Sequence, residues 1–340
     1  MSTDEERELQ TRHISAVITE TVIFSLVMIL SLFGNLLVCY AVYRNPRLRC
    51  PSNYYIISLA LTDILQGSCS MPLSVVFLAT GEWSFGTGTC EFFAITKLSL
   101  TKVSTFTMGL MALTRYYKIV KPSKYLTIFK PRCIVITALL AWAIPFTLAF
   151  LLVFVLDQET KPNASYAMCI ISFSNPYFFS ILIVFMYSPY FVIGFCYWKI
   201  YKQVKMHNAN VSWRSSNVAD VKISKTLFAT VIAFFSFFVP SHIIFIISRF
   251  EEYSHFPRYL FLLASLFIFM TSCINPFIYG YMNRAFKTEF KKWFVPKRGH
   301  SVNIALAIRR RKKAARSKDE EEEDKRESIV DKESYSKRRF

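Results

Sequence analysis

Long apolar runs separated by short polar segments dominate the chain. Seven of these runs reach the roughly 20 residues that an α-helix needs to cross the hydrocarbon core of a bilayer. They lie at about 18–43, 53–79, 88–113, 132–156, 177–201, 223–248 and 257–281. The pattern predicts an all-α membrane protein whose main domain, residues 18–282, is a seven-transmembrane helix bundle.

A shorter amphipathic segment, residues 283–294, follows the seventh run. Its Phe286, Phe290, Trp293 and Phe294 recur at helical spacing, and basic residues occupy positions between them. A helix with one aromatic face and one basic face lies in the interface between lipid and water. We therefore expect a short interfacial eighth helix.

Basic residues gather in alternate connecting segments. The segments at 44–49, 118–132 and 199–222 are rich in lysine and arginine, whereas TGEWSFGTG has neither and DQETKPNAS has one lysine. This bias is the positive-inside distribution of membrane proteins. It predicts that the N-terminal tail, residues 1–17, is extracellular and that the C-terminus is cytoplasmic.

The composition agrees with a multi-pass protein of the plasma membrane. Hydrophobic residues make up 53% of the chain and charged residues only 19%, which is too little polar surface for a soluble domain of this length. The net charge of +18 lies in the loops and tail, so no nucleic-acid partner is expected. The acidic start, MSTDEERELQ, lacks the basic n-region of a cleavable signal peptide.

Two cysteines are expected on the oxidising side of the membrane. Cys90 lies at the outer end of the third run and Cys169 in the next outer segment, so we expect a disulfide between them. Two unpaired thiols are the alternative. Asn163 begins a glycosylation sequon in the same outer segment, whereas the sequon at Asn210 falls on the cytoplasmic side and is expected to stay unmodified.

Polar side chains interrupt the apolar runs. Asp63 lies in the middle of the second run, Asn35 and Asn275 lie at comparable depth, and Ser104 and Ser272 are placed to join them. An ionisable group inside a bilayer costs about 2.5–3.5 kcal/mol even on the most lenient scale, so such residues are functional candidates. Two interpretations stay open. One is a sodium ion held by Asp63, Ser104, Ser272 and Asn275, and the other is a static hydrogen-bond network between helices. No other metal or cofactor is expected.

Prolines interrupt the last three runs at Pro189, Pro240 and Pro276. A proline inside a helix removes one backbone hydrogen bond and favours a kink. Beside a polar network, these kinks are interpreted as hinges for a rigid-body switch, with simple packing as the alternative.

Together these features resemble the rhodopsin-like (class A) G-protein-coupled receptors, from the first run to the interfacial helix. The resemblance rests on motifs that occur in the family's order. The motifs are Asn35 in GNLLV, Asp63 in LALTD, EWSFG with Trp83 leading to Cys90, TRY at 114–116, Trp142, Pro189 with Tyr197, FFSFFVP ending at Pro240, and NPFIY at 275–279.

The resemblance implies a receptor, not an enzyme. Such a receptor binds an extracellular small-molecule ligand in the outer half of the bundle and promotes nucleotide exchange on a cytoplasmic heterotrimeric G protein. Arg115 is implied to turn toward the G protein when the sixth helix swings outward, and a snorkelling arginine is the alternative. The implied coupling and switch residues are Thr114, Arg115, Tyr116, Tyr197, Asp220, Phe238, Pro240, Asn275, Pro276 and Tyr279.

The chain departs from the family's pattern at two of these positions. Thr114 stands where most relatives carry an acidic residue, and Phe238 stands where a tryptophan is usual. Asp220 occupies the position of an acidic latch for Arg115. We hypothesise that Asp220 supplies most of the restraint on Arg115 and that basal activity is appreciable, so Asp220→Ala should change ligand-free signalling.

Two positions exclude familiar ligands. Biogenic-amine receptors resemble one another in an aspartate where this chain has Lys97, which would repel an ammonium group. Opsins resemble one another in a lysine where this chain has Phe269, so covalent retinal is not expected.

An apolar cavity with one or two cations suits an amphipathic anion, such as a carboxylate-bearing lipid or a small acid. The alternative is internal pairing of Lys97 with a carboxylate, for which Glu20, Glu91, Glu159 and Glu251 are candidates. The ligand-binding candidates are Lys97, Thr101, Lys102, Phe178, Phe185, Phe238, Ser241, His242, Phe245 and Phe269.

Two other functions stay open. The segments CINPFIYGYMNRAFKTEFKKWF and VFMYSPYFVIGFCYWKIY are weakly similar to the melatonin-receptor group and its invertebrate relatives, which suggests an indole ligand. However, Phe185 replaces the histidine that those receptors present to the ligand. A membrane transporter is the other alternative, although the chain shows no repeated half.

Residues 295–340 form a charged tail. Its blocks of like charge, RRRKKAAR and DEEEED, predict disorder, and the basic block is expected to contact anionic membrane lipids. A solvated tail with no partner is the alternative to recruitment of a receptor kinase and arrestin. The phosphorylation candidates are Ser328, Ser334, Tyr335 and Ser336.

Overall fold

The structure is a computed structural model that describes most of the chain. The predicted tail at 295–340 and the sequon at Asn210 lie outside the described residues, as do residues 1–8 of the predicted N-terminal tail. The described ranges are 9–49, 53–172, 176–208, 215–248 and 256–294.

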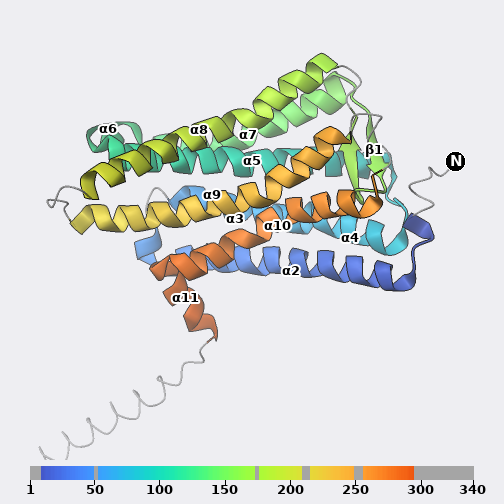
Figure 1. The fold of residues 1–340 in the computed structure, drawn as a ribbon, viewed down its shortest axis with the longest axis horizontal. Helices are drawn as coiled ribbons and strands as arrows, with labels where there is room; N and C mark the ends of the chain where they lie inside the picture. The colour runs from blue at the N-terminus through green and yellow to red at the C-terminus, as the bar shows by residue number, and fades with distance from the viewer. Residues whose placement is uncertain (1–8, 50–52, 173–175, 209–214, 249–255, 295–340) are drawn as a thin grey trace, which may run out of the picture. The chain divides into compact units, whose positions relative to one another are not determined.

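Long helical segments run along one another in the described part of the chain and form the seven-helix bundle that the apolar runs predict (Figure 1). The predicted fold class is confirmed. The segments are α2 (Ile14–Arg44), α3 (Tyr54–Leu65) continued through η3 (Gln66–Ser70) into α4 (Met71–Thr80), α5 (Gly86–Val120), α7 (Pro131–Phe150) with η4 (Leu151–Val155), α8 (Pro176–Asn208), α9 (Ser215–Ile247) and α10 (Arg258–Met282).

Among the described residues, five of these segments are long and apolar enough to span a membrane on length and hydropathy alone, and α5 and α8 are not among them. The helix α5 carries charged side chains at Lys97, Lys102 and Arg115, all within the bundle. Some side chains of α8 lie outside the described part of the chain. The helix α5 contacts α3, α7, α8 and α9 and lies at the centre of the bundle. Its polar side chains therefore face other helices and not lipid.

Several helices continue beyond the apolar runs that predict them. The helix α5 extends past residue 113 to Val120, and α9 begins at Ser215, well before residue 223. An α-helix satisfies its own backbone hydrogen bonds, so it can continue from lipid into water without cost to those groups. The apolar pattern therefore marks the part of a helix in lipid and not the ends of the helix.

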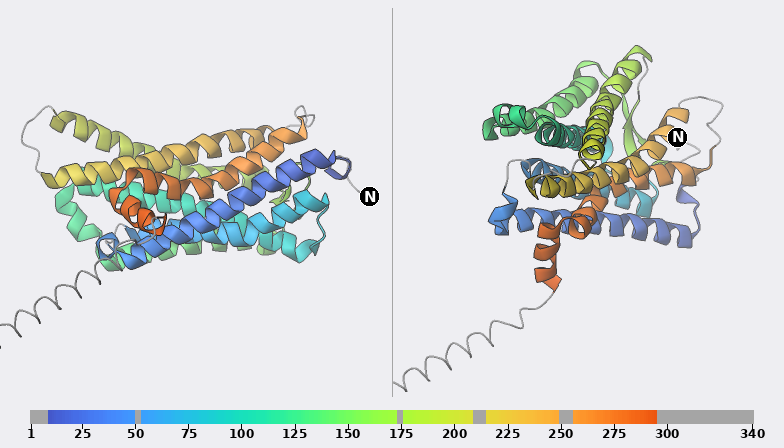
Figure 2. Two further views of the ribbon diagram at one scale, coloured as in Figure 1. Left: turned by 90° about the horizontal axis from the view of Figure 1, so that it is seen from below. Right: turned by 60° about the vertical axis from the view of Figure 1, so that its left-hand side comes forward.

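The helices α2 and α10 lie side by side, as both views in Figure 2 show. Their close approach depends on Gly34, because a Cβ atom at this position would lie 2.9 Å from Cγ of Pro276. The interfacial segment forms α11 (Arg284–Phe294), which follows α10 directly. Phe286 of α11 is fully buried and stacks on Tyr279, with 5.6 Å between ring centroids.

Two short elements that the sequence did not predict form a hairpin between α7 and α8. The strands β1 (Thr160–Asn163) and β2 (Met168–Ile171) pair antiparallel. Cys169 in β2 is bonded to Cys90 at the start of α5, so the predicted disulfide is confirmed. The bond fixes the hairpin over one end of the bundle, which we call the hairpin end. Other short helices are η1 (Pro46–Leu48) and α6 (Pro122–Ile128).

An ion-pair cluster joins α2 to α10 at the hairpin end. The carboxylate of Glu20 pairs with Arg12, which precedes α2, and with Arg258, which begins α10. The guanidinium of Arg12 also donates to the carbonyl of Leu78 in α4. Burial lowers the pKa of Arg12, and the nearby Glu20 carboxylate opposes this shift. Only 5% of the Arg12 side chain and 17% of the Glu20 side chain are exposed, so solvent screens this cluster less than a surface pair.

Replacing Glu20 with glutamine should destabilise the receptor by about 3 kcal/mol, because two buried guanidinium groups lose their counter-charge. The measurement is thermal unfolding of the purified receptor in detergent. Glu82→Gln is the matched control, since Glu82 is exposed at the same end of the bundle. Equal unfolding temperatures for Glu20→Gln and the wild type would show that the cluster contributes nothing.

Candidate functional site

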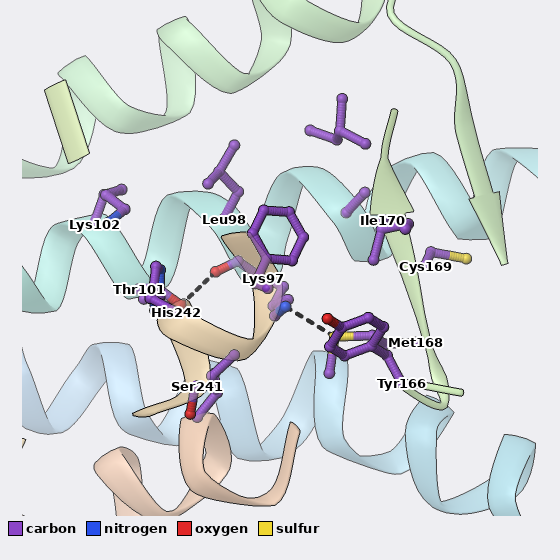
Figure 3. A pocket seen from close by; sticks show the side chains of 14 residues that line it. Lys97, Leu98, Thr101, Lys102, Tyr166, Met168, Cys169, Ile170, Ser241 and His242 are labelled. Carbon is purple, nitrogen blue, oxygen red and sulfur yellow. Dashed lines mark hydrogen bonds between the residues drawn. The ribbon is translucent and has the colours of Figure 1, made fainter. Parts of the chain in front are cut away.

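A cavity of about 110 Å³ lies at the hairpin end of the bundle, between α5, α9, α10 and the hairpin. Figure 3 shows the lysines of α5 along one wall, with side chains from α9 and β2 near them. Its walls are mostly apolar, with a few polar groups. The lining residues are Ala94, Lys97, Leu98, Thr101, Lys102, Tyr166, Met168, Cys169, Ile170, Ile171, Ser241, His242, Phe245 and Ile268.

Two lysines of α5 give the cavity a positive charge. Lys102 is only 1% exposed, and its Nζ has no hydrogen-bond partner among the described residues. This Nζ lies 5.1 Å from the centre of the Phe238 ring. Lys97 donates to Sδ of Met168 at 2.8 Å, and a thioether is a weak acceptor that carries no negative charge.

The predicted internal partners of Lys97 do not neutralise it in the described part of the chain. Glu20 is occupied by the two arginines of the ion-pair cluster. Glu91 and Glu159 are described, and neither forms a salt bridge with Lys97 or Lys102. Glu251 lies outside the described residues. Both ammonium groups therefore face the cavity without a carboxylate from the described chain.

His242 of α9 is held beside Lys102. Its Nδ1 donates to the carbonyl of Phe238 at 3.1 Å, because a carbonyl can only accept. The imidazole also stacks on the Phe238 ring, with 3.6 Å between centroids. This arrangement fixes the tautomer and leaves Nε2 available to a ligand. Ser241 lies next to His242, and its hydroxyl donates to the carbonyl of Phe237 at 2.8 Å.

The hairpin covers the cavity and is attached to two helices. The carbonyl of Tyr166 accepts a hydrogen bond of 2.7 Å from the hydroxyl of Ser265 in α10. The phenol of Tyr166 lies 3.1 Å from the hydroxyl of Ser248, which follows α9. Tyr166, Met168 and the other hairpin residues of this site were not predicted from the sequence. The only signal that pointed to them was Cys169, since its disulfide brings the segment onto α5.

The structure brings six of the ten predicted ligand candidates to the cavity. Phe238 lies behind His242 and does not line it. Phe269 packs against Phe24 of α2, and Phe185 packs against Phe106 of α5. The side chain of Phe178 lies outside the described residues. The candidates that line the cavity are Lys97, Thr101, Lys102, Ser241, His242 and Phe245.

Buried polar side chains join α2, α3 and α10 in the middle of the bundle. Asn275 donates to Oδ2 of Asp63 at 2.9 Å. Asn35 donates to the carbonyls of Ser31 and Ser272, both at 2.9 Å. The structure therefore contains the predicted hydrogen-bond network, which ties the first, second and seventh helices of the bundle together.

The predicted sodium ligands offer only oxygen atoms. Ser104 and Ser272 line a small cavity of about 10 Å³ beside the network. Asn275 Oδ1 is buried and has no hydrogen-bond partner among the described residues. Asp63 and Asn275 do not line this cavity, and Asp63 is connected to it by its hydrogen bond with Ser272. Carboxylate, hydroxyl and amide oxygens are the ligands that hard cations take, so this donor set fits a sodium ion.

Five of the predicted coupling residues, Thr114, Arg115, Tyr116, Tyr197 and Tyr279, lie toward the opposite end of the bundle from the hairpin, whereas Phe238 lies beside the cavity and Asn275 in the middle of the bundle. Arg115 is 1% exposed, and Tyr197 of α8 lies near enough to interact with it electrostatically. The hydroxyl of Thr114 donates to the carbonyl of Leu110 at 2.7 Å, so its hydrogen bond lies within α5. Tyr116 and Tyr279 are also buried. The side chain of Asp220 lies outside the described residues, so the latch hypothesis stays a prediction.

The chain thus forms a seven-helix bundle with a cavity at one end and buried polar residues toward the other. Residues 34–279 match the family described as 7 transmembrane receptor (rhodopsin family). The chain belongs to this family. It is therefore a multi-pass membrane receptor of the G-protein-coupled class and not an enzyme.

The chain is also similar to individual receptors. It is 28% identical to the histamine H2 receptor of Homo sapiens over 285 residues, which cover 82% of this chain and 79% of the relative. It is 24% identical to the octopamine receptor beta-1R of Drosophila melanogaster over 315 residues, 82% of this chain and 62% of the relative. It is 32% identical to the dopamine D2-like receptor of the same species over 177 residues, 52% of this chain and 19% of the relative.

Proposed function

We propose that this receptor binds a small amphipathic anion in the cavity beneath the hairpin. Binding then promotes nucleotide exchange on a cytoplasmic heterotrimeric G protein. The observation that carries the proposal is the pair of ammonium groups, Lys97 and Lys102, that face one largely apolar cavity without a carboxylate from the described residues.

The cavity holds positive charge that no described carboxylate compensates. A buried ammonium without a partner is costly, and a carboxylate placed between the two lysines removes this cost and adds charge-assisted hydrogen bonds. The apolar walls, with Leu98 and Phe245, suit a ring or a short alkyl group. A volume of about 110 Å³ favours a small acid over a carboxylate-bearing lipid.

The similar receptors named above are named for amines, and Lys97 argues against carrying that ligand class over to this chain. An ammonium group would meet two positive charges in the cavity. A melatonin-like indole, the second candidate from the sequence, would leave both lysines unpaired, and the relatives named above do not favour it. Membership of the receptor family likewise does not favour a transporter.

Matched acids and amines test this function. Imidazoleacetate with histamine, hydroxyphenylacetate with tyramine, and indoleacetate with tryptamine differ mainly in the sign of one group. Nucleotide exchange by purified G protein should be stimulated by at least one acid and by none of the amines. Stimulation by an amine without its acid would refute the anion proposal, and accumulation of a labelled solute in vesicles without exchange would favour a transporter.

We also propose a sodium ion beside Asp63, supported by the all-oxygen donor set. In that case sodium chloride should raise the unfolding temperature of the ligand-free receptor more than potassium chloride of equal ionic strength. Asp63→Asn should abolish this difference, because a neutral amide binds a cation more weakly. Asp157→Asn is the control at an exposed position. A sodium effect that survives Asp63→Asn would place the ion elsewhere.

The proposed topology puts the hairpin end outside the cell and the other end in the cytoplasm of the plasma membrane, in accord with the basic segments. Receptor kinase, arrestin and membrane lipids are proposed partners of the tail. Glycosylation at Asn163 is proposed as well. The carboxamide oxygen of Asn163 accepts a hydrogen bond of 2.9 Å from the backbone of Tyr166.

A further inference from the structure

A groove of about 540 Å³ lies between α8 and α9, and it shares no lining residue with the cavity beneath the hairpin. We call it the α8–α9 groove. Its lining is almost entirely apolar and aromatic. The residues on α8 are Tyr190, Ile193, Gly194, Tyr197, Trp198, Ile200, Tyr201 and Val204, and those on α9 are Val221, Ser224, Lys225, Phe228, Val231, Ile232 and Phe235.

The groove is open to the surroundings of the bundle. Trp198 is 56% exposed and Tyr201 is 66% exposed. On α8 the lining runs from Tyr190 to Val204, a length of about 21 Å at 1.5 Å per residue. One leaflet contributes roughly 15 Å of hydrocarbon to a bilayer. The groove is therefore long enough to hold an acyl chain from the leaflet at that depth.

Buried hydroxyls line the groove along its length, with Tyr190 at one end and Ser224 at the other. Ser224 is 3% exposed, and its hydroxyl has no hydrogen-bond partner among the described residues. The hydroxyl of Tyr197 is likewise buried without such a partner. Lys225 lines the same end as Ser224 and is exposed. With the topology proposed above, this end lies at the cytoplasmic surface, where anionic lipid headgroups are attracted to basic side chains.

We propose that the α8–α9 groove binds one anionic phospholipid from the cytoplasmic leaflet. The acyl chain lies along the aromatic face of α8, the phosphate approaches Lys225, and the hydroxyl of Ser224 donates to a lipid oxygen. The charge of Lys225 selects an anionic headgroup over a zwitterionic one. A bound headgroup supplies a partner for the buried hydroxyl of Ser224, since buried donors usually have partners.

Gly194 provides a direct test, because a Cβ atom added there would meet no atom within 4 Å. Gly194→Leu therefore fills the groove without a backbone clash. The full-length receptor would be reconstituted in bilayer discs of phosphatidylcholine and phosphatidylglycerol, and bound lipid would be counted by native mass spectrometry. Gly194→Leu should retain at least about tenfold less phosphatidylglycerol than wild type, because the leucine side chain occupies the space of the acyl chain and removes its packing contacts.

Ala143→Leu is the matched control, because Ala143 is an exposed small residue of α7 away from the groove. It should retain lipid as the wild type does. Retention by Gly194→Leu equal to that of Ala143→Leu would overturn the proposal.

A charge variant tests the headgroup separately and does not depend on how Gly194→Leu folds. Lys225→Gln should still retain a phospholipid but lose the preference for phosphatidylglycerol over phosphatidylcholine. Lys124→Gln, at another exposed basic position, should keep that preference. Equal binding of the two lipids by the wild type would contradict the proposal that the groove selects an anionic headgroup. An unchanged preference in Lys225→Gln would contradict the proposal that this lysine contacts the headgroup.

Discussion

Replacing Lys102 with methionine is expected to weaken binding of an anionic ligand by at least about 30-fold and, at the same time, to stabilise the ligand-free receptor. Loss of one partner from a buried, hydrogen-bonded charge pair costs about 2–5 kcal/mol, and 2 kcal/mol corresponds to roughly 30-fold. Methionine keeps an unbranched chain of similar length but carries no charge. It therefore removes the ammonium that has no hydrogen-bond partner among the described residues.

The two effects have opposite signs because the buried charge of Lys102 destabilises the ligand-free receptor, whereas in the liganded receptor the same charge binds the anion. Replacing buried charge with an apolar side chain often raises stability by about 1–4 kcal/mol. The measurements are binding of the most potent acid from the matched panel and thermal unfolding without ligand. Lys161→Met, at an exposed position of the hairpin, should change neither. Lower stability with unchanged binding would contradict the role given to Lys102.

Replacing Arg115 with alanine is expected to weaken coupling strongly while leaving ligand binding almost unchanged. Arg115 is buried near Tyr197, far along α5 from the cavity that holds Lys97 and Lys102. Coupling free energies between two sites of about 1–3 kcal/mol correspond to 5–150-fold effects. Stimulated nucleotide exchange should therefore fall at least about tenfold.

The measurement combines ligand binding with exchange on purified G protein, in receptor that has reached the membrane. Arg132→Ala removes an exposed arginine beside the same end of α5 and should preserve exchange. Intact exchange by Arg115→Ala would mean that this arginine is only an anchor at the interface, which was the alternative from the sequence.

The fold was largely predictable because each helix in lipid needs a long apolar run. The predicted disulfide followed from topology alone, since Cys90 and Cys169 were the two cysteines assigned to the outer side. The hairpin was not predictable, because strands of four residues are too short to show an alternating pattern and Pro162 disfavours one. The ends of the helices were also not predictable, because an apolar run does not show how far its helix continues into water.

The residues that line the cavity were predictable where they lie together on one helix. They were not predictable where their position depends on how two helices pack. Lys97, Thr101 and Lys102 follow from their spacing on α5. Phe269 lay at a family position for a ligand contact, yet its ring turns toward Phe24 of α2. The neighbouring Ile268 lines the cavity instead. A rotation of about 100° separates successive helical residues, so a single sequence does not determine which of two neighbours faces the cavity.

A single substitution, Lys97→Asp, replaces one of the two positive charges of the cavity with a negative charge. Binding of one matched pair, the most potent acid and its amine, would be measured on the wild type and on this variant. We predict that the wild type binds the acid in preference to the amine and that Lys97→Asp loses this preference or reverses it. A wild type that binds the amine better, or an acid preference that survives in Lys97→Asp, would contradict the proposal that this receptor recognises an anion.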